Sequence, residues 1–202
     1  MNIKLSEITQ IISGFSFRSA MKTVEQGTHF VVQAHDIYIN NQTIDVHKLD
    51  IITFNSKSKD PLLKDGDILL SARGTETNGF KAAIYFGKEF TVVASSSLYI
   101  LRLKDSRIIP EYLLYYINSS RGQKTLRNIM MGSTVKTISK KDLLELSIPI
   151  PPIEKQKIIV DTMTNMIRQK ILLKKKIQLL NTLTYNINSS IKLYDKNKST
   201  RS

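Results

Sequence analysis

Hydrophobic and polar positions change period several times along residues 1–150, which predicts short strands mixed with short helices. Apolar and polar positions alternate over residues 29–39. This period of two predicts a half-buried strand with Gln33 and His35 on its polar face. Residues 43–46 are predicted to form the short return strand.

A second group of strands is predicted between residues 62 and 103. Asp65-Gly66 suits a tight turn, and the apolar run that follows it predicts a buried strand over residues 68–70. Residues 73–81, with the sequence RGTETNGFK, are expected to form a polar loop that leads to another strand at 82–86. A further strand is predicted over residues 91–103, interrupted by the three small hydroxyl residues Ser95, Ser96 and Ser97.

Helix signals occur mainly after residue 109. Pro110 suits the first position of a helix. A second helix is predicted over residues 121–130 and ends at Gly132. A third is predicted to start at Ser139, which is a suitable N-cap with Asp142 three residues later. Near the N-terminus, a short amphipathic segment begins at Lys4 and ends at Gly14.

The pattern changes after the proline-rich segment 147–152, and we place a domain boundary between residues 150 and 151. Beyond it, apolar residues recur every seven positions at Ile159, Met166, Leu173, Leu180, Ile187 and Tyr194, and a companion series three or four residues away comprises Met163, Lys170, Ile177, Thr184 and Ile191. The heptads predict a coiled-coil helix over residues 151–194 and a flexible tail over 195–202. Such a helix would be roughly 60 Å long, so it needs a partner helix from a second copy or another subunit.

The predicted fold class is therefore α+β (mixed α/β): a domain with a twisted β-sheet over residues 1–150, followed by one long coiled-coil α-helix. The net charge of +13, from 30 Lys and Arg against 17 Asp and Glu, indicates which partners the chain could bind. Residues 151–202 hold 11 basic and 3 acidic residues, so they carry most of the excess. Nucleic acid is the leading partner on this basis, an acidic protein surface is second, and a solvated basic surface without a partner is third.

The signatures of several kinds of chemistry are missing from the sequence. It has no cysteine, no glycine-rich phosphate loop and no nucleophile elbow, and its three histidines lack the spacing of a zinc enzyme, so no metal site is expected. The tetrapeptide with which an adenine methyltransferase holds its target amine is also missing. No apolar stretch approaches a membrane span or a signal peptide. We therefore expect a soluble, cytoplasmic protein without a membrane partner, and catalysis that belongs to another subunit.

A series of motifs resembles the specificity subunits of type I restriction-modification enzymes. The N-terminal motifs are Leu5-Ser6-Glu7-Ile8, Gly14-Phe15-Ser16-Phe17-Arg18-Ser19, Asp36-Ile37 and the segment from Gly66 to Gly74. The C-terminal motifs are Tyr112-Leu113-Leu114-Tyr115-Tyr116, Gly122-Gln123, Gly132-Ser133-Thr134, Ile138-Ser139, Leu143, Leu146 and the segment from Ile148 to Gln156. The proline-rich junction that leads into a long helix is the most specific of these motifs.

The resemblance implies a non-catalytic DNA-recognition subunit that directs an adenine-N6 methyltransferase, and an endonuclease where one is present, to a bipartite DNA site. Subunits of this family carry two target recognition domains and two conserved helices, whereas this chain resembles a half-length form with one of each. Two copies paired antiparallel along the heptad positions would rebuild the two-fold arrangement and read a palindromic, interrupted site. A heterodimer with another half-subunit is the alternative to this homodimer.

The resemblance also implies where the cofactors belong. No cofactor is expected in this chain. S-adenosylmethionine would be held by the methyltransferase (M) subunit, and ATP and Mg²⁺ would be held by the motor-nuclease (R) subunit where one is present.

Candidate DNA contacts fall into two groups. The candidates for base reading are Gln33, His35, Arg73, Thr75, Glu76, Thr77 and Asn78, since Arg suits guanine, and Asn or Gln suits adenine, through two hydrogen bonds each. The candidates for phosphate binding are Arg18, Lys22, Lys81, Ser133, Thr134 and Lys136. Phe15 and Phe17 are interpreted as core residues beneath a loop.

In the long helix, the candidate dimer or partner contacts are Ile159, Met163, Met166, Leu173, Ile177, Leu180, Ile187 and Ile191. Lys174, Lys175 and Lys176 suit DNA phosphates, an acidic methyltransferase surface or plain solvation. Two rival functions stay open: a regulatory or inhibitory coiled-coil half-subunit that binds the methyltransferase without reading DNA, and a small metal-dependent nuclease. Binding without sequence preference would indicate the first, and DNA cleavage by the purified chain with magnesium would indicate the second.

Overall fold

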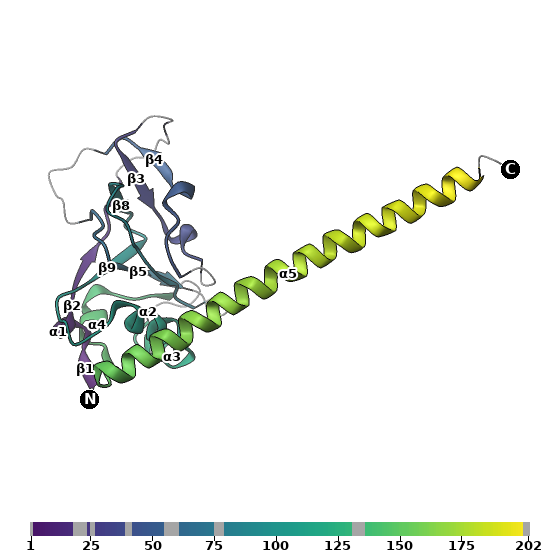
Figure 1. Cartoon of the computed structure of the whole chain (residues 1–202). Coiled ribbons are helices and arrows are strands. Elements are labelled where there is room, and N and C mark those ends of the chain that lie inside the picture. The colour runs from purple at the N-terminus through teal and green to yellow at the C-terminus, as the bar shows by residue number, and fades with distance from the viewer. Residues whose placement is uncertain are drawn as a thin grey trace. The chain divides into compact units, whose positions relative to one another are not determined.

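In the computed structural model, the described residues are 2–17, 24, 27–38, 42–54, 61–74, 79–130 and 136–199, of which 190–199 are described as backbone only (Figure 1). The chain forms two compact units, Met1–Val160 and Asp161–Ser202. In chain order the elements are β1 (Asn2–Lys4), α1 (Leu5–Ile8), β2 (Thr9–Ser13), β3 (His29–Val32), the 3₁₀ turns η1 (Ala34–Asp36) and η2 (Val46–Lys48), β4 (Asp50–Ile52), β5 (Ile68–Ser71), β6 (Arg73–Gly74), β7 (Ala82–Ile84), β8 (Val92–Ala94), β9 (Leu98–Leu103), α2 (Pro110–Asn118), α3 (Ser120–Asn128), β10 (Lys136–Thr137), α4 (Lys140–Glu145), β11 (Ser147–Pro149) and α5 (Ile153–Ser199). The predicted fold class, a mixed α+β domain followed by one long helix, is confirmed.

The first unit is built on a four-stranded antiparallel sheet in the order β2-β9-β5-β7. The central strand β5 is buried on both faces. Ile68 and Leu70 pack with the core around α1, α2 and α4, whereas Leu69 packs into a second core on the other face. The predicted buried strand over 68–70 is confirmed, and it follows the predicted turn, in which Gly66 adopts a φ of 83°.

A second sheet, in the order β4-β3-β8, contributes Val32, Val92 and Ala94 to the second core. The predicted strand over 29–39 is wrong beyond Val32, because the Asp36 side chain forms a hydrogen bond with the backbone at that point. Its Oδ2 accepts a hydrogen bond from the backbone N–H of Gln33 at 2.8 Å, and this local bond stabilises the 3₁₀ turn η1 in place of a longer strand. The predicted return strand over 43–46 is also wrong, since β3 pairs antiparallel with β4.

The predicted strand over 91–103 is two strands that belong to different sheets. Strand β8 pairs in parallel with β3, whereas β9 pairs with β2 and β5. The three serines form the turn between them. Their small side chains allow the chain to pass from one sheet to the other in a tightly packed position, where Ser95 is 5% exposed.

The predicted helix starts are confirmed. Pro110 is the first residue of α2, and the Ser139 hydroxyl accepts a hydrogen bond from the backbone N–H of Asp142 at 3.1 Å at the start of α4. Helix α3 ends at Asn128, two residues earlier than predicted, and Gly132 lies outside the described residues. The segment after Lys4 forms α1 and then β2, which the sequence pattern did not separate.

The proline-rich junction continues the first unit. Strand β11 pairs antiparallel with β1, so the two ends of the domain lie side by side. Gln156, in the first turns of α5, is fully buried. Its Oε1 accepts from the backbone N–H of Ile109 at 2.9 Å, and its Nε2 donates to the carbonyl oxygens of Arg107 and Pro151 at 2.8 and 2.9 Å. The start of α5 is thus tied to the turn before α2.

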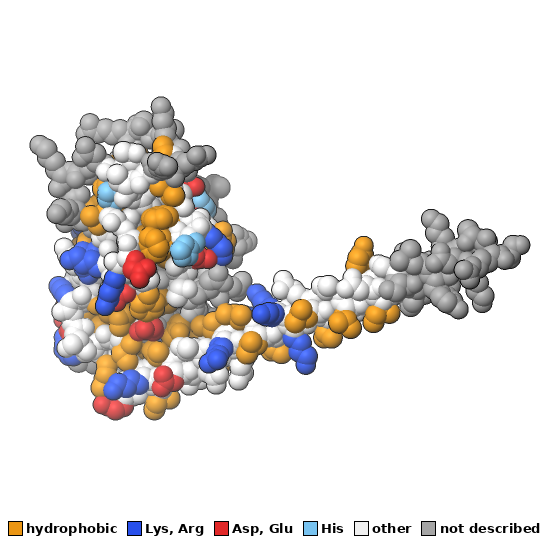
Figure 2. Space-filling model, turned by 45° about the horizontal axis from the view of Figure 1, so that its top comes forward, with side chains coloured by type: hydrophobic (Ala, Val, Ile, Leu, Met, Phe, Trp, Pro, Cys, Tyr) orange, Lys and Arg blue, Asp and Glu red, His pale blue; other side chains and the backbone are white. Residues whose placement is uncertain are grey.

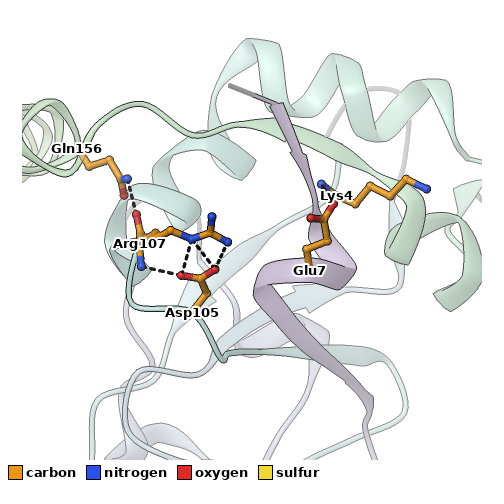
Figure 3. A network of polar contacts seen from close by, with 5 residues as sticks. All are labelled: Lys4, Glu7, Asp105, Arg107 and Gln156. Atoms are coloured by element: carbon orange, nitrogen blue, oxygen red, sulfur yellow. Dashed lines mark hydrogen bonds and ion pairs between the residues drawn. The ribbon is translucent and has the colours of Figure 1, made fainter.

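Figure 3 shows this attachment together with the ion pair that shapes the turn. The Arg107 guanidinium donates to both carboxylate oxygens of Asp105, with Nε at 3.0 and 2.9 Å. The hydrogen bond from the Arg107 side chain lowers the pKa of Asp105 below its ordinary value. The Arg107 side chain thus stabilises the turn from which the Arg107 carbonyl oxygen accepts the hydrogen bond of Gln156.

We expect Gln156→Leu to destabilise the first unit. Leucine fills a similar volume but leaves the N–H of Ile109 and two carbonyl oxygens without their partner, and each unpaired buried group costs roughly 1–3 kcal/mol. Urea unfolding of the full chain would measure the change in the free energy of unfolding. The matched control, Gln178→Leu, changes an exposed glutamine of α5, and equal stabilities of the two variants would contradict the prediction.

Candidate nucleic-acid interface

The serine turn between β8 and β9 brings together two segments that carry predicted base-reading residues. The Ser97 hydroxyl oxygen accepts a hydrogen bond from the backbone N–H of Ala34 at 3.1 Å, between Gln33 and His35. The Ser97 carbonyl oxygen accepts another from the N–H of Ala72 at 2.9 Å, next to Arg73. Two segments that are distant in the sequence therefore lie on either side of one turn.

Gln33 and His35 do not share the polar face of a strand as predicted. Gln33 is half-buried just before η1, and His35 lies within that turn. The His35 side chain is 67% exposed, with Nε2 3.3 Å from Oδ1 of Asp36. The Asp36 carboxylate thus contacts both residues: it accepts a hydrogen bond from the backbone N–H of Gln33 and lies beside the ring of His35. Their role in base reading stays a prediction.

Arg73 lies in a short strand rather than in a loop. Strand β6 pairs antiparallel with β10, with Arg73 opposite Thr137 and Gly74 opposite Lys136. The N–H of Ile138 also donates to the carbonyl of Ala72 at 3.2 Å. The Arg73 side chain is exposed. Lys136, a predicted phosphate contact, is on the neighbouring strand, but its side chain belongs to the opposite face of the ladder from Arg73, because successive residues of a strand alternate between the two faces.

The far end of the segment 73–81 is held by a clamp from α3. Gln123 Oε1 accepts from the N–H of Phe80 at 2.9 Å, and its Nε2 donates to the carbonyl of Phe80 at 2.8 Å. Gly79 has a φ of 59°, which favours glycine, and a Cβ there would lie 2.3 Å from Gln123 Oε1 and disturb the clamp. Lys81 is tied to β5 by a hydrogen bond from its N–H to Ser71 Oγ at 2.9 Å.

Eight of the predicted contacts cannot be compared with the structure. Thr75, Glu76, Thr77, Asn78, Arg18, Lys22, Ser133 and Thr134 lie outside the described residues. Residues 75–78 connect Gly74 to Gly79, and residues 131–135 lead into β10. Both segments therefore start or end at the β6–β10 ladder.

Sequence reasoning missed a basic face on α3. Arg121, Lys124 and Arg127 are exposed on this helix, which contains no acidic residue. The signal was present in the sequence as three basic residues spaced by three, which share one side of a helix. Without the structure, nothing connected that helix to the segment 73–81.

Phe15 and Phe17 pack as core residues, as interpreted from the sequence. Their rings lie 4.9 Å apart, and Phe15 is also 4.9 Å from Phe54, in edge-to-face contacts next to a small buried cluster. His29 joins this group 5.1 Å from the Phe54 ring, and burial lowers its pKa. Among the described residues, no three His, Asp or Glu side chains gather as metal ligands.

The second unit carries an exposed apolar face. The heptad residues Met166, Leu173, Ile177, Leu180 and Ile187 are each between 53% and 61% exposed. Ile159 packs against the core of the first unit, Met163 is half-buried, and the side chain of Ile191 lies outside the described residues. Leu172, Leu179 and Leu183 add exposed apolar surface beside the heptad positions. Figure 2 shows hydrophobic side chains along the described part of this helix.

The exposed residues of α5 are not those of a membrane span. No described helix combines enough length with enough apolar character to cross a bilayer. Lys170, Lys174, Lys175 and Lys176 interrupt the apolar positions. An apolar face of this extent is unusual on a monomer and typical of a surface that binds another protein.

Comparison with known protein families decides what kind of chain this is. The family model of the type I restriction modification DNA specificity domain matches residues 1–183. The chain belongs to this family. The resemblance drawn from the motifs is therefore confirmed, and the family match agrees with the expectation of a non-catalytic specificity subunit.

Individual relatives agree with the family match. The chain is 31% identical over 147 residues to the putative type I restriction enzyme MjaX specificity subunit of Methanocaldococcus jannaschii, covering 71% of this chain and 34% of that protein. The chain thus spans about a third of the length of this relative.

Solved structures share the fold. The HsdS subunit of Thermoanaerobacter tengcongensis superposes with a TM-score of 0.61 at 24% identity, over 88% of this chain and 39% of that one. A chain from a study of complex assembly and conformational transition of the type I R-M system gives a TM-score of 0.62 at 22% identity, over 87% and 40%. At these identities the likeness supports the fold alone.

Proposed function

We propose that this chain is a sequence-specific DNA-recognition subunit that directs an adenine-N6 methyltransferase, and an endonuclease where one is present, to a bipartite DNA site. The family match supports the recognition of DNA. The observation that carries the site is that the segments of His35 and Arg73 both form hydrogen bonds with Ser97 of the serine turn. Both side chains are exposed, and their backbones are held by the 3₁₀ turn η1 and by the β6–β10 ladder, which suits contacts to base edges.

The proposal includes an antiparallel homodimer formed through α5. A face on which leucines and isoleucines are more than half exposed needs a partner, and a second copy supplies a complementary heptad pattern. The additional leucines at 172, 179 and 183 make the apolar arc wider than one two-stranded seam requires. This width favours a second neighbour, for which we propose the methyltransferase subunit.

The proposed division of labour leaves the cofactors with the partners. S-adenosylmethionine would be bound by the methyltransferase, and ATP and Mg²⁺ by the motor-nuclease subunit where one is present. This chain would determine the DNA site, since two recognition domains held by symmetric helices read two half-sites at a fixed separation.

The test is to co-express the chain with the adenine methyltransferase encoded beside it and to map methylated adenines across the genome. We expect one palindromic, interrupted motif. Arg73→Ala should relax or abolish recognition at one position of each half-site, since a bidentate arginine–guanine contact contributes roughly 1–3 kcal/mol of discrimination. Lys104→Ala, at an exposed basic residue after β9, is the control and should leave the motif unchanged.

Two outcomes would contradict the proposal. A stable complex that adds no methylation would indicate a regulatory or inhibitory half-subunit, and an asymmetric motif would indicate a heterodimer. An unchanged motif in the Arg73→Ala variant would remove this residue from base reading while leaving the proposed function in place.

A further inference from the structure

Helix α3 has a basic face that is not part of the candidate site at the β6–β10 ladder and the serine turn. Arg121, Lys124 and Arg127 are exposed, and among the described residues no carboxylate forms an ion pair with them. At about 100° per residue, the three side chains span an arc of roughly 120°. Three positive charges on one side of a nine-residue helix without an acidic residue form a surface that favours a polyanion.

The position of this helix is tightly determined. A Cβ at Gly122 would lie 2.0 Å from the carbonyl oxygen of Tyr116, so α3 approaches α2 as closely as glycine permits. The Ser119 hydroxyl caps α3 by accepting from the N–H of Gly122 at 3.1 Å. On the preceding helix, Asn118 exchanges hydrogen bonds with the backbone of Ala82 in β7 at 3.2 and 3.0 Å. The corner between the two helices is therefore attached to the sheet.

The same helix holds one end of the candidate base-reading segment. Gln123, which lies between two of the basic residues in the sequence, donates to and accepts from the backbone of Phe80. Its Nε2 also donates to the carbonyl of Ile117 at 2.9 Å. Figure 1 shows α2 and α3 beside one another at one end of the first unit. The position of Phe80 is therefore coupled to that of α3.

We propose that Arg121, Lys124 and Arg127 bind DNA phosphates, and that Gln123 attaches this phosphate-binding helix to Phe80, at the described end of the candidate base-reading segment. Contacts to phosphates determine the register of a protein on the duplex, whereas contacts to base edges select the sequence. This inference rests on the proposed function and adds to it a positioning surface.

The experiment uses the complex of the full chain with its methyltransferase, and it measures the affinity for a duplex of the methylated motif and for a scrambled duplex over a range of salt concentrations. The variant is Arg121→Gln/Lys124→Gln/Arg127→Gln. We expect affinity for both duplexes to fall about equally. The slope of log affinity against log salt should decrease in magnitude by about 0.9 for each phosphate that the variant no longer neutralises. The methylated motif should stay the same.

A charge-matched control separates this surface from the overall charge. Lys88→Gln/Lys104→Gln/Lys157→Gln removes the same charge from exposed positions elsewhere and should change the slope much less. Gln123→Leu tests the clamp: it should keep the salt slope but reduce the affinity ratio between cognate and scrambled duplex by about tenfold, an effect that the basic residues alone would not produce.

The outcomes distinguish this inference from the proposed function. If the unmodified complex shows no sequence preference, the proposed function fails. If it reads its motif but the α3 variant retains the full salt slope, only the present inference is overturned. Dissociation of the methyltransferase from the complex with an unchanged slope would show that the basic face binds an acidic protein surface, which also overturns it.

Discussion

Replacing both Leu173 and Leu180 with aspartate is expected to abolish methylation of the bipartite site while leaving the recognition domain folded. Both leucines lie in the heptad series and are 61% and 54% exposed in the single chain, so neither contributes to its core. In an antiparallel pair they would become buried. Each replaced leucine removes roughly 1.5–3 kcal/mol of apolar burial, and a carboxylate buried without a partner adds a larger cost. With two positions in each of two copies, the total exceeds what a typical interface tolerates.

The measurement combines a genome-wide map of methylated adenines with the mass of the complex in solution. The control Thr164→Asp/Thr182→Asp introduces the same residue twice on the opposite side of the helix, about 180° from Leu173, where both threonines are exposed. This control should keep the dimer and the methylation. Methylation that persists in the leucine variant would exclude the heptad face as the dimer contact.

The second large effect is expected at the ion pair between Asp67 and Arg102, which joins the start of β5 to β9. The Asp67 side chain is 2% exposed, and its carboxylate accepts from Arg102 Nε at 2.9 Å and from Nη2 at 2.7 Å. Arg102 Nη2 also donates to the carbonyl of Leu62 at 2.9 Å. Arg102→Met would leave a buried carboxylate without its cation, which destabilises a protein by about 3–5 kcal/mol.

Urea unfolding of the variant chain would measure this destabilisation. The double variant Asp67→Asn/Arg102→Met removes the unpaired charge and should recover part of the stability, because the penalty comes from the isolated carboxylate rather than from the missing attraction. Lys48→Met, at an ion pair on the surface, should leave the midpoint of unfolding nearly unchanged. A double variant no more stable than Arg102→Met would contradict this explanation.

Features that depend on a few neighbouring residues could be read from the sequence. Pro110 and Ser139 begin helices because their φ angle and hydroxyl act within one turn. Asp65-Gly66 makes its turn because Gly66 adopts a positive φ without a steric cost. The motif order was sufficient to recognise the family, since it spans nearly the whole chain.

Features that depend on distant residues could not be read in this way. The early end of the strand at 29–32 is a local exception, because the side-chain hydrogen bond to Asp36 spans only three residues but is concealed by the alternating pattern. The split between β8 and β9 follows from their pairing with strands in two different sheets. The role of Gln123 in holding Phe80 depends on a contact between residues 43 positions apart.

The candidate DNA interface shows the same division. The sequence by itself determined the family, the long heptad helix and the residue types suited to bases and phosphates, because composition and period are local properties. Only the tertiary structure decided that the segments of His35 and Arg73 both bond to Ser97, that Lys136 lies across a ladder from Gly74, and that Gln123 of α3 holds the backbone of Phe80. These relations arise from long-range backbone hydrogen bonds and close packing, which no local pattern specifies.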